Sequence, residues 1–145
     1  MKSKDRLRKK YYSIRKKNYF HIKPNYFNSL INFIEKKYKK KYINVSIYYP
    51  FAFEIDILKL LETKIIRRMK VFLPVIKSSN LMNFYEWSKE DVLQINKFGM
   101  LEPIISKNHT IPDVMMVPLL AYDDKKNRLG YGKGFYDRYL KKYLK

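Results

Sequence analysis

Residues 112–138 read PDVMMVPLLAYDDKKNRLGYGKGFYDR, and this stretch decides how the chain can fold. Three of the four glycines of the whole sequence lie in it, at Gly130, Gly132 and Gly134. Glycine permits a positive φ and lets a ligand approach the backbone closely. Alternate glycines around Lys133, after a strand and before a helix, are typical of a loop that wraps an anion with backbone N–H groups.

The segments on either side of the glycines support this interpretation. The apolar run 113–117 predicts a short buried strand. From Phe135 onward the apolar residues recur at helical spacing, which predicts a helix, and Asp137 falls in its first turns. A carboxylate there suits the helix dipole and could hold a magnesium ion. The glycine spacing matches neither common phosphate-binding motif, so a plain tight turn is the alternative for the glycines taken alone.

The ordered pattern from Val117 to Arg138 resembles the signature of the 5-formyltetrahydrofolate cyclo-ligase family, also called methenyltetrahydrofolate synthetases. That signature has an apolar strand ending in proline, an aromatic–acid pair, Arg-Leu-Gly-x-Gly-x-Gly, two aromatics and an aspartate. The matching residues are Pro118, Tyr122-Asp123, residues 128–134, Phe135-Tyr136 and Asp137. The resemblance also covers, more weakly, residues 4–8, 42–56 and 69–74.

Length and composition limit the alternatives. A chain of 145 residues predicts a single domain over residues 1–145 with a modest core. The absence of cysteine excludes disulfides and thiolate chemistry and is compatible with the cytoplasm. The sequence shows neither a membrane span nor a signal peptide, so we expect a cytoplasmic protein without a membrane partner, and a monomer.

The formal net charge of +19 attracts polyanions. One alternative is therefore a noncatalytic basic protein that binds nucleic acid, with its 14 tyrosines and 9 phenylalanines stacking on bases. However, the lysines are spread along the chain, as an A+T-rich genome would produce, and the aromatics mostly occupy apolar periodic positions. We therefore expect no dedicated nucleic-acid partner, whereas anionic small molecules would benefit from the charge.

The N-terminal residues 2–17 predict a helix with an apolar stripe of Leu7, Tyr11 and Ile14. Its start, residues 4–8, resembles the family's Lys-x-x-Leu-Arg segment, which implies a place in the ATP site. Lys4 and Arg8 are four residues apart, so both cations can lie on one helix face and reach one polyphosphate. The alternative is a solvated basic helix.

Strand-like and helix-like segments alternate along the rest of the chain. Helices are predicted over 26–37 and 54–68, and strands over 42–49, 69–74 and 80–87. This order predicts an α/β fold with three layers, in which a mostly parallel sheet carries helices on both faces. Tyr49, Pro74 and Pro118 are expected to mark strand ends, where ligands of such sheets bind.

The resemblance implies ATP-dependent conversion of 5-formyltetrahydrofolate to 5,10-methenyltetrahydrofolate, with ATP and Mg²⁺ required. It assigns Arg128 and Lys133 as catalytic and Asp137 as the metal ligand. The implied ATP-binding residues are Lys4, Asp5, Arg6, Leu7, Arg8, Arg128, Leu129, Gly130, Tyr131, Gly132, Lys133, Gly134, Phe135 and Tyr136. The implied folate-binding residues are Tyr49, Glu54, Phe98, Tyr131, Gly132, Lys133, Gly134 and Phe135.

Three of these implications have alternatives. Glu54 could merely cap the helix expected after it, and Phe98 could be an ordinary core aromatic. Members of the family continue beyond the helix that follows the glycines and carry another aspartate there. We therefore expect this chain to be short at its C-terminus, with a weakened metal site and low activity, so an inactive truncated homologue is a further alternative.

Overall fold

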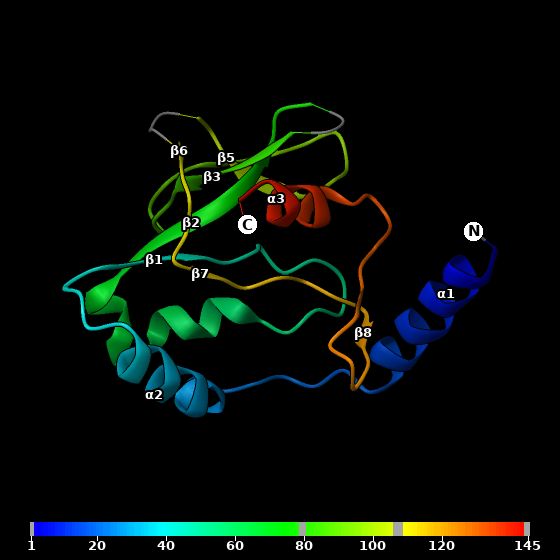
Figure 1. Cartoon of the computed structure of the whole chain (residues 1–145), viewed down its shortest axis with the longest axis horizontal. Coiled ribbons are helices and arrows are strands. Elements are labelled where there is room, and N and C mark those ends of the chain that lie inside the picture. Colours follow the sequence, from blue (N-terminus) through cyan, green and yellow to red (C-terminus); the bar gives the residue numbers. More distant parts are fainter. Residues whose placement is uncertain (1, 79–80, 106–108, 144–145) are drawn as a thin grey trace.

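A five-stranded sheet forms the centre of the computed structural model, which describes residues 2–78, 81–105 and 109–143 (Figure 1). Its strands lie in the order β6 (His109–Thr110), β3 (Met82–Glu86), β2 (Met69–Ile76), β1 (Ile43–Ser46) and β7 (Val114–Met115). Strand β1 is parallel to β2 and β7, whereas β3 is antiparallel to β2 and β6. The predicted α/β class is confirmed, and the sheet is parallel in one half and antiparallel in the other.

Helical segments cover both faces of this sheet. The first face carries the 3₁₀ helices η1 (Pro24–Phe27), η2 (Ile57–Glu62) and η3 (Lys64–Arg68) and the α-helix α2 (Asn28–Lys37). The second face carries α3 (Phe135–Tyr143). Successive residues of a strand point to opposite faces, and β2 accordingly packs Val71 under the first layer and Phe72 under the second.

The core is divided between the two faces. Fully buried Ile34, Leu60 and Ile65 pack against β1 and β2 on the first face. On the second face the rings of Phe84 and Tyr139 meet edge to face, with centroids 4.8 Å apart. This contact fixes α3 on the sheet and thereby sets the position of the glycine-rich loop that precedes it.

The helix predicted over 54–68 is wrong in type, because the chain forms the two short 3₁₀ helices η2 and η3 instead. Thr63 between them has an extended backbone (φ −96°, ψ 161°), and its hydroxyl donates to the carbonyl of Leu60 at 2.6 Å. Side-chain bonds of this kind compete with helical bonds and end the first helix. Asp56 caps η2 by accepting from the backbone N–H of Leu58 at 3.2 Å.

The remaining predicted elements are confirmed with shifted bounds. The helix expected over 26–37 starts as η1 and continues as α2, and the strands expected over 42–49 and 80–87 are β1 and β3, with residue 80 outside the described residues. Tyr49 and Pro118 lie shortly after β1 and β7. Pro74 does not end a strand: it lies inside β2, opposite Phe84 of β3.

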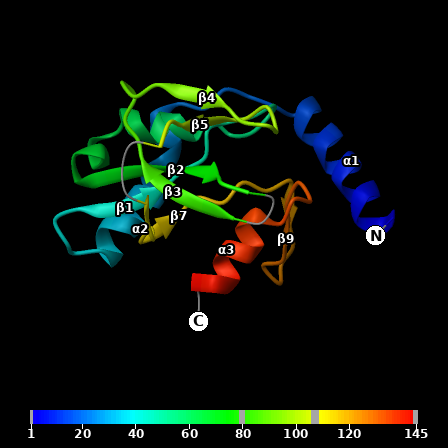
Figure 2. The same cartoon turned by 90° about the horizontal axis from the view of Figure 1, so that it is seen from above.

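The helix α1 (Lys2–Lys17) has the predicted bounds but not the predicted contact face. Of the expected apolar stripe, Leu7 and Ile14 are 42% and 43% exposed and only Tyr11 is half-buried, as are Arg8 and Arg15. In both views α1 stands at the edge of the molecule, beside the hairpin of β8 (Ala121–Tyr122) and β9 (Arg128–Leu129) (Figures 1 and 2). Polar contacts to that hairpin and its loop, together with the edge-to-face contact of Tyr12 with Phe53, orient α1.

A second hairpin is formed by β4 (Leu93–Ile95) and β5 (Leu101–Pro103), which pair antiparallel. It packs against β2 and carries the turn at residues 96–100. Among the described residues, no helix has both the length and the apolar character that crossing a bilayer requires.

Candidate active site

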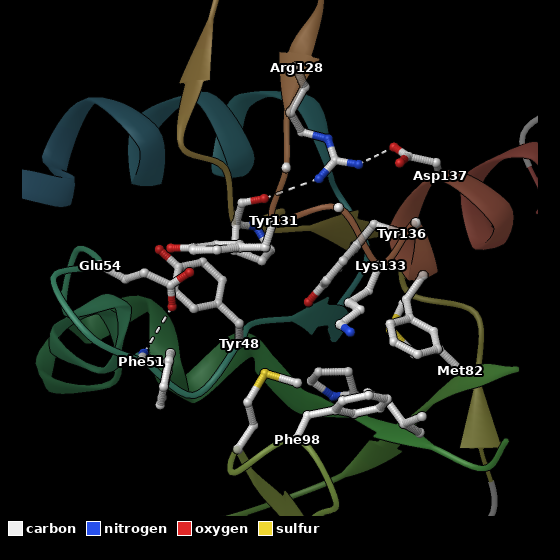
Figure 3. A pocket seen from close by; sticks show the side chains of 18 of the residues that line it. Tyr48, Phe51, Glu54, Met82, Phe98, Arg128, Tyr131, Lys133, Tyr136 and Asp137 are labelled. Carbon is white, nitrogen blue, oxygen red and sulfur yellow. Dashed lines mark hydrogen bonds and ion pairs between the residues drawn. The ribbon is translucent and has the colours of Figure 1, made fainter. Parts of the chain in front are cut away.

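A cavity of about 470 Å³ lies between the glycine-rich loop, the N-terminal helix and the 96–100 turn (Figure 3). Most of the residues predicted for the site line it: Lys4, Arg8, Tyr49, Glu54, Phe98, every residue from Arg128 to Tyr136, and Asp137. Asp5, Arg6 and Leu7 do not line it. The fold thus gathers residues from the two ends of the chain and from its middle around one space.

The glycine-rich loop is shaped by close arginine contacts. Gly132 and Gly134 have positive φ values of 99° and 69°. A Cβ on Gly132 would lie 3.0 Å from Cζ of Arg8, and one on Gly134 would lie 2.8 Å from Nη1 of Arg138. Both positions therefore favour glycine because of the backbone conformation, and a Cβ at either one would also displace the end of an arginine side chain.

Arg8 connects α1 to this loop. Its Nε donates to the carbonyl of Gly130 at 3.0 Å, and its Nη1 is 2.5 Å from Oδ1 of Asp5. Asp5 thus acts on the site indirectly, by orienting Arg8. Arg15, two helical turns further along α1, donates from Nη1 to the hydroxyl of Tyr131 at 2.6 Å and also pairs with the carbonyl of Leu119.

Arg128 and Asp137 form an ion pair beside the N-terminal end of α3 (Figure 3). Nη1 of Arg128 also donates to the carbonyl of Pro118 at 3.1 Å, and its guanidinium lies 5.9 Å from the ring centroid of Tyr136. Arg128 is mostly buried, while the Asp137 side chain is 69% exposed. The pair therefore holds the arginine in place and leaves much of the carboxylate accessible.

Lys133 extends into the cavity from the loop (Figure 3). Its Nζ lies 5.4 Å from the ring centroid of Phe98, which is within the range of a cation–π contact. Phe98 also meets Phe135 edge to face, with centroids 5.7 Å apart. The lysine thus lies between the loop and the aromatic wall opposite it.

Glu54 is a buried carboxylate in the lining of the cavity, 6% exposed. Its Oε2 accepts from the backbone N–H of Phe51 at 2.9 Å, in a turn where Ala52 has a positive φ of 50°. Burial raises the pKa of Glu54, while hydrogen bonds from Phe51 and Tyr131 and the charge of Arg15 act in the opposite direction. Glu54 lies before η2, which Asp56 caps instead, so the predicted capping alternative is wrong.

Three tyrosines face this carboxylate. Burial, followed by the charge of Glu54, raises the pKa of Tyr48 to about 12 and raises those of Tyr131 and Tyr136 as well. The hydroxyl oxygen of Tyr136 is buried and has no hydrogen-bond partner among the described residues. A buried unpaired hydroxyl is costly unless a ligand satisfies it. It is therefore a candidate ligand contact.

The sequence did not lead us to predict two of these polar residues, Arg15 and Tyr48. Arg15 lies seven residues after Arg8, so the helical period could have placed it on the same face. Tyr48 gave no such signal, because the chain has left the regular strand geometry beyond Ser46 and alternation no longer predicts where a side chain points.

The part of the chain that the structure describes contains no group of three or more histidine, aspartate or glutamate side chains able to enclose a metal ion. Asp137 is an accessible cavity carboxylate next to the glycine-rich loop. Magnesium usually keeps several waters and uses one or two carboxylates together with substrate phosphates. Asp137 fits that limited role but not an all-protein metal cage.

The fold and the cavity define an α/β protein with a cavity between a glycine-rich loop and a basic helix. The chain belongs to the 5-formyltetrahydrofolate cyclo-ligase family, whose sequence model matches residues 2–145. The predicted family is thereby confirmed.

Individual relatives agree with this assignment. The 5-formyltetrahydrofolate cyclo-ligase of Haemophilus influenzae is 33% identical over 116 residues, covering 76% of this chain and 60% of the relative. A probable 5-formyltetrahydrofolate cyclo-ligase of Schizosaccharomyces pombe is 40% identical over 79 residues, covering 50% of this chain and 39% of the relative. The chain thus spans less than two thirds of the length of either relative.

Solved structures share the fold. The NMR structure of 5,10-methenyltetrahydrofolate synthetase from Aquifex aeolicus superposes with a TM-score of 0.70 at 27% identity, covering 95% of this chain and 72% of that chain. A 5,10-methenyltetrahydrofolate synthetase from Mycoplasma pneumoniae gives a TM-score of 0.71 at 21% identity, covering 98% and 79%. The second likeness concerns the fold alone.

Proposed function

We propose that this chain converts 5-formyltetrahydrofolate to 5,10-methenyltetrahydrofolate, with ATP converted to ADP and phosphate. The observation that carries the proposal is the arrangement of the cavity. The glycine-rich loop with Lys4, Arg8 and Lys133 and the buried carboxylate of Glu54 line the same space. Such a cavity can hold a polyphosphate and a polar ring system side by side.

The chemistry explains why both substrates must meet. A formamide oxygen is a poor leaving group, so it first takes the γ-phosphoryl group of ATP as the bond to ADP breaks. The second folate nitrogen then attacks the activated carbon, the carbon–oxygen bond breaks, and phosphate and the nitrogen's proton leave. The protein supplies positioning and charge stabilisation for the transferring group.

The residues divide into two groups under this proposal. Lys4, Arg8 and Lys133 contact the phosphates, and the loop backbone cradles them. Arg128 orients the loop through its bond to Pro118 and its ion pair with Asp137. Asp137 provides the protein carboxylate for Mg²⁺, which screens phosphate charge when it accompanies ATP. The roles of Lys4, Arg8, Lys133 and Asp137 follow the family pattern and the lining of the cavity, whereas the role given to Arg128 rests on its two contacts and replaces the phosphate contact that the resemblance implies.

Glu54 and the aromatics serve the folate. The carboxylate of Glu54 accepts hydrogen bonds from N–H groups of the pterin ring, and Phe98 flanks the flat ring. Tyr49 and the Tyr131–Phe135 segment complete the folate side of the cavity. The hydroxyl of Tyr136, unpaired among the described residues, donates to a substrate oxygen. This last contact would satisfy a polar atom that is otherwise buried without a partner.

A turnover assay tests the proposal directly. The purified chain is mixed with 5-formyltetrahydrofolate, ATP and Mg²⁺, and the absorbance of the methenyl product is followed. We expect product only when both substrates are present, with ADP formed in equal amount. ATP hydrolysis independent of folate, or no product despite binding of both ligands, would refute the proposed activity.

A further inference from the structure

We propose that Asn96 and Glu102 are positioning residues that hold Phe98 as one wall of the folate side of the cavity. The inference rests on the proposed function for the identity of the ligand. It adds a role for two polar residues that do not themselves carry out the chemistry. The basis is a chain of hydrogen bonds that runs from the central sheet to the ring of Phe98.

Glu102 joins this series of hydrogen bonds to the central sheet. It is 5% exposed, and its Oε2 accepts from the backbone N–H of Ile76, the last residue of β2, at 3.1 Å. The same oxygen accepts from Nδ2 of Asn96 at 2.9 Å. A buried carboxylate is retained only where hydrogen bonds replace its lost hydration. Here those bonds join the rigid strand to the 96–100 turn.

Asn96 continues the series of hydrogen bonds from Glu102 into the 96–100 turn. Its Oδ1 accepts from the backbone N–H groups of Phe98 at 2.9 Å and Met100 at 3.2 Å. Its backbone closes the same turn, with N–H donating to Met100 and C=O accepting from Gly99, both at 2.9 Å. Gly99 has a φ of 76°, which completes the reversal. One side chain therefore fixes the backbone on both sides of Phe98.

The ring of Phe98, held in this way, lies against other residues of the cavity lining. It contacts Phe135 at the start of α3 and lies under Nζ of Lys133, while Phe98, Met100 and Leu101 line the space. A flat substrate ring entering the cavity must pack against this wall. A turn without the Asn96–Glu102 connection would let the ring rotate or withdraw, and ligand affinity would fall because the wall must then be ordered on binding.

The test uses folate affinity measured by quenching of Trp87, the single tryptophan, whose ring centroid lies 6.3 Å from that of the cavity residue Tyr49. We expect Asn96→Ala to weaken 5-formyltetrahydrofolate binding about tenfold, as for a lost ordered aromatic contact, with ATP affinity within about twofold. Glu102→Gln should bind folate nearly normally, because one carbonyl oxygen can accept both bonds that Oε2 accepts. Glu102→Ala should resemble Asn96→Ala.

A double-mutant cycle separates positioning from general stability. In a Phe98→Leu background the wall ring is absent, so adding Asn96→Ala should change folate affinity by less than about twofold. Equal losses from Asn96→Ala with and without Phe98 would overturn the proposal and indicate direct contact or a purely structural role. Asn32→Ala on the exposed face of α2 and Glu90→Gln in an exposed turn serve as matched controls.

This test also distinguishes the inference from the proposed function. If the wild-type chain binds folate but does not turn it over, the proposed activity fails while the affinities still test the wall. If wild type turns over and every variant binds folate equally, the inference fails alone. If the wild-type chain does not bind folate at all, both fail.

Discussion

Arg8 and Gly132 are in close contact, since a Cβ on Gly132 would lie 3.0 Å from Cζ of Arg8 and 3.2 Å from its Nε. The first helix and the glycine-rich loop therefore pack directly against each other, although Arg8 and Gly132 are 124 positions apart in the sequence (132 − 8). Because Arg8 also donates to the carbonyl of Gly130, a change in the loop should alter the position of Arg8 on the helix.

Gly132→Ala tests this contact. We expect a loss of about 1–2 kcal/mol in stability from the positive φ, and a fall in ATP affinity of at least about tenfold because Arg8 is displaced. Calorimetric titration with ATP measures the second effect. Gly99→Ala is the control for ATP binding, since Gly99 also has a positive φ but no atom within 4 Å of an added Cβ. An equal loss of ATP affinity in both variants would refute a specific role for the Arg8 contact.

Lys133→Met should weaken ATP binding by about 10- to 100-fold, as expected for a hydrogen bond to a charged phosphate. Its melting temperature should stay close to that of wild type, since the Lys133 side chain is exposed. Lys125→Met, in the exposed turn between β8 and β9, is the matched control for the loss of one positive charge. Unchanged nucleotide affinity in folded Lys133→Met would remove Lys133 from the phosphate site.

Glu54→Gln should reduce folate affinity about tenfold or more and change ATP affinity little, because the proposed function has this carboxylate accept hydrogen bonds from the folate. Folate titrations of both proteins, followed by Trp87 fluorescence, provide the measurement. Small and equal losses for the two ligands would exclude a folate-specific role.

Glu54→Gln also tests how the folding stability depends on pH. Burial raises the pKa of Glu54 above its ordinary value of 4.5, so the folded protein keeps this proton to a higher pH than the unfolded chain. The stability from this group is full below 4.5 and is lost as pH rises through the raised pKa. Thermal melts from about pH 5 to about pH 8 should therefore show Glu54→Gln gaining stability relative to wild type. A constant difference across that range would contradict the raised pKa.

Asp137→Asn should abolish most of the gain in ATP affinity that Mg²⁺ provides, while lowering stability by less than about 1 kcal/mol because the ion pair with Arg128 is solvent-exposed on the aspartate side. ATP titrations with and without Mg²⁺ give the comparison. Asp124→Asn in the exposed hairpin turn is the control. An undiminished Mg²⁺ effect in Asp137→Asn would show that the metal is held elsewhere.

Tyr136→Phe removes a buried hydroxyl that has no partner among the described residues. We expect stability to be unchanged or to rise by up to about 1 kcal/mol, because an unsatisfied polar atom is lost. Folate affinity or turnover should nevertheless fall. Tyr139→Phe, on the same helix but outside the cavity lining, should leave both unchanged. Lower stability with intact folate affinity in Tyr136→Phe would place the hydroxyl in the fold rather than the site.

The sequence by itself determined the local elements and the family. Helical spacing located α1, α2 and α3, and β-branched runs located β1 and β2, because these signals depend on neighbours within a few residues. The ordered pattern from Val117 to Arg138 led to the family that the sequence model confirms. The 3₁₀ character of residues 57–68 was not predictable from spacing, since it depends on where Thr63 bonds.

Only the tertiary structure decided which side chains meet. The docking face of α1 is set by Arg8 and Arg15, which find partners in a loop more than a hundred residues away, so the apolar stripe of the helix was a misleading guide. The pairing of Arg128 with Asp137, and the anchoring of Asn96 by Glu102, likewise depend on the fold. Hydrogen bonds and ion pairs require a few ångströms of proximity, and such proximity between distant segments is a property of the packed sheet and its layers rather than of local sequence.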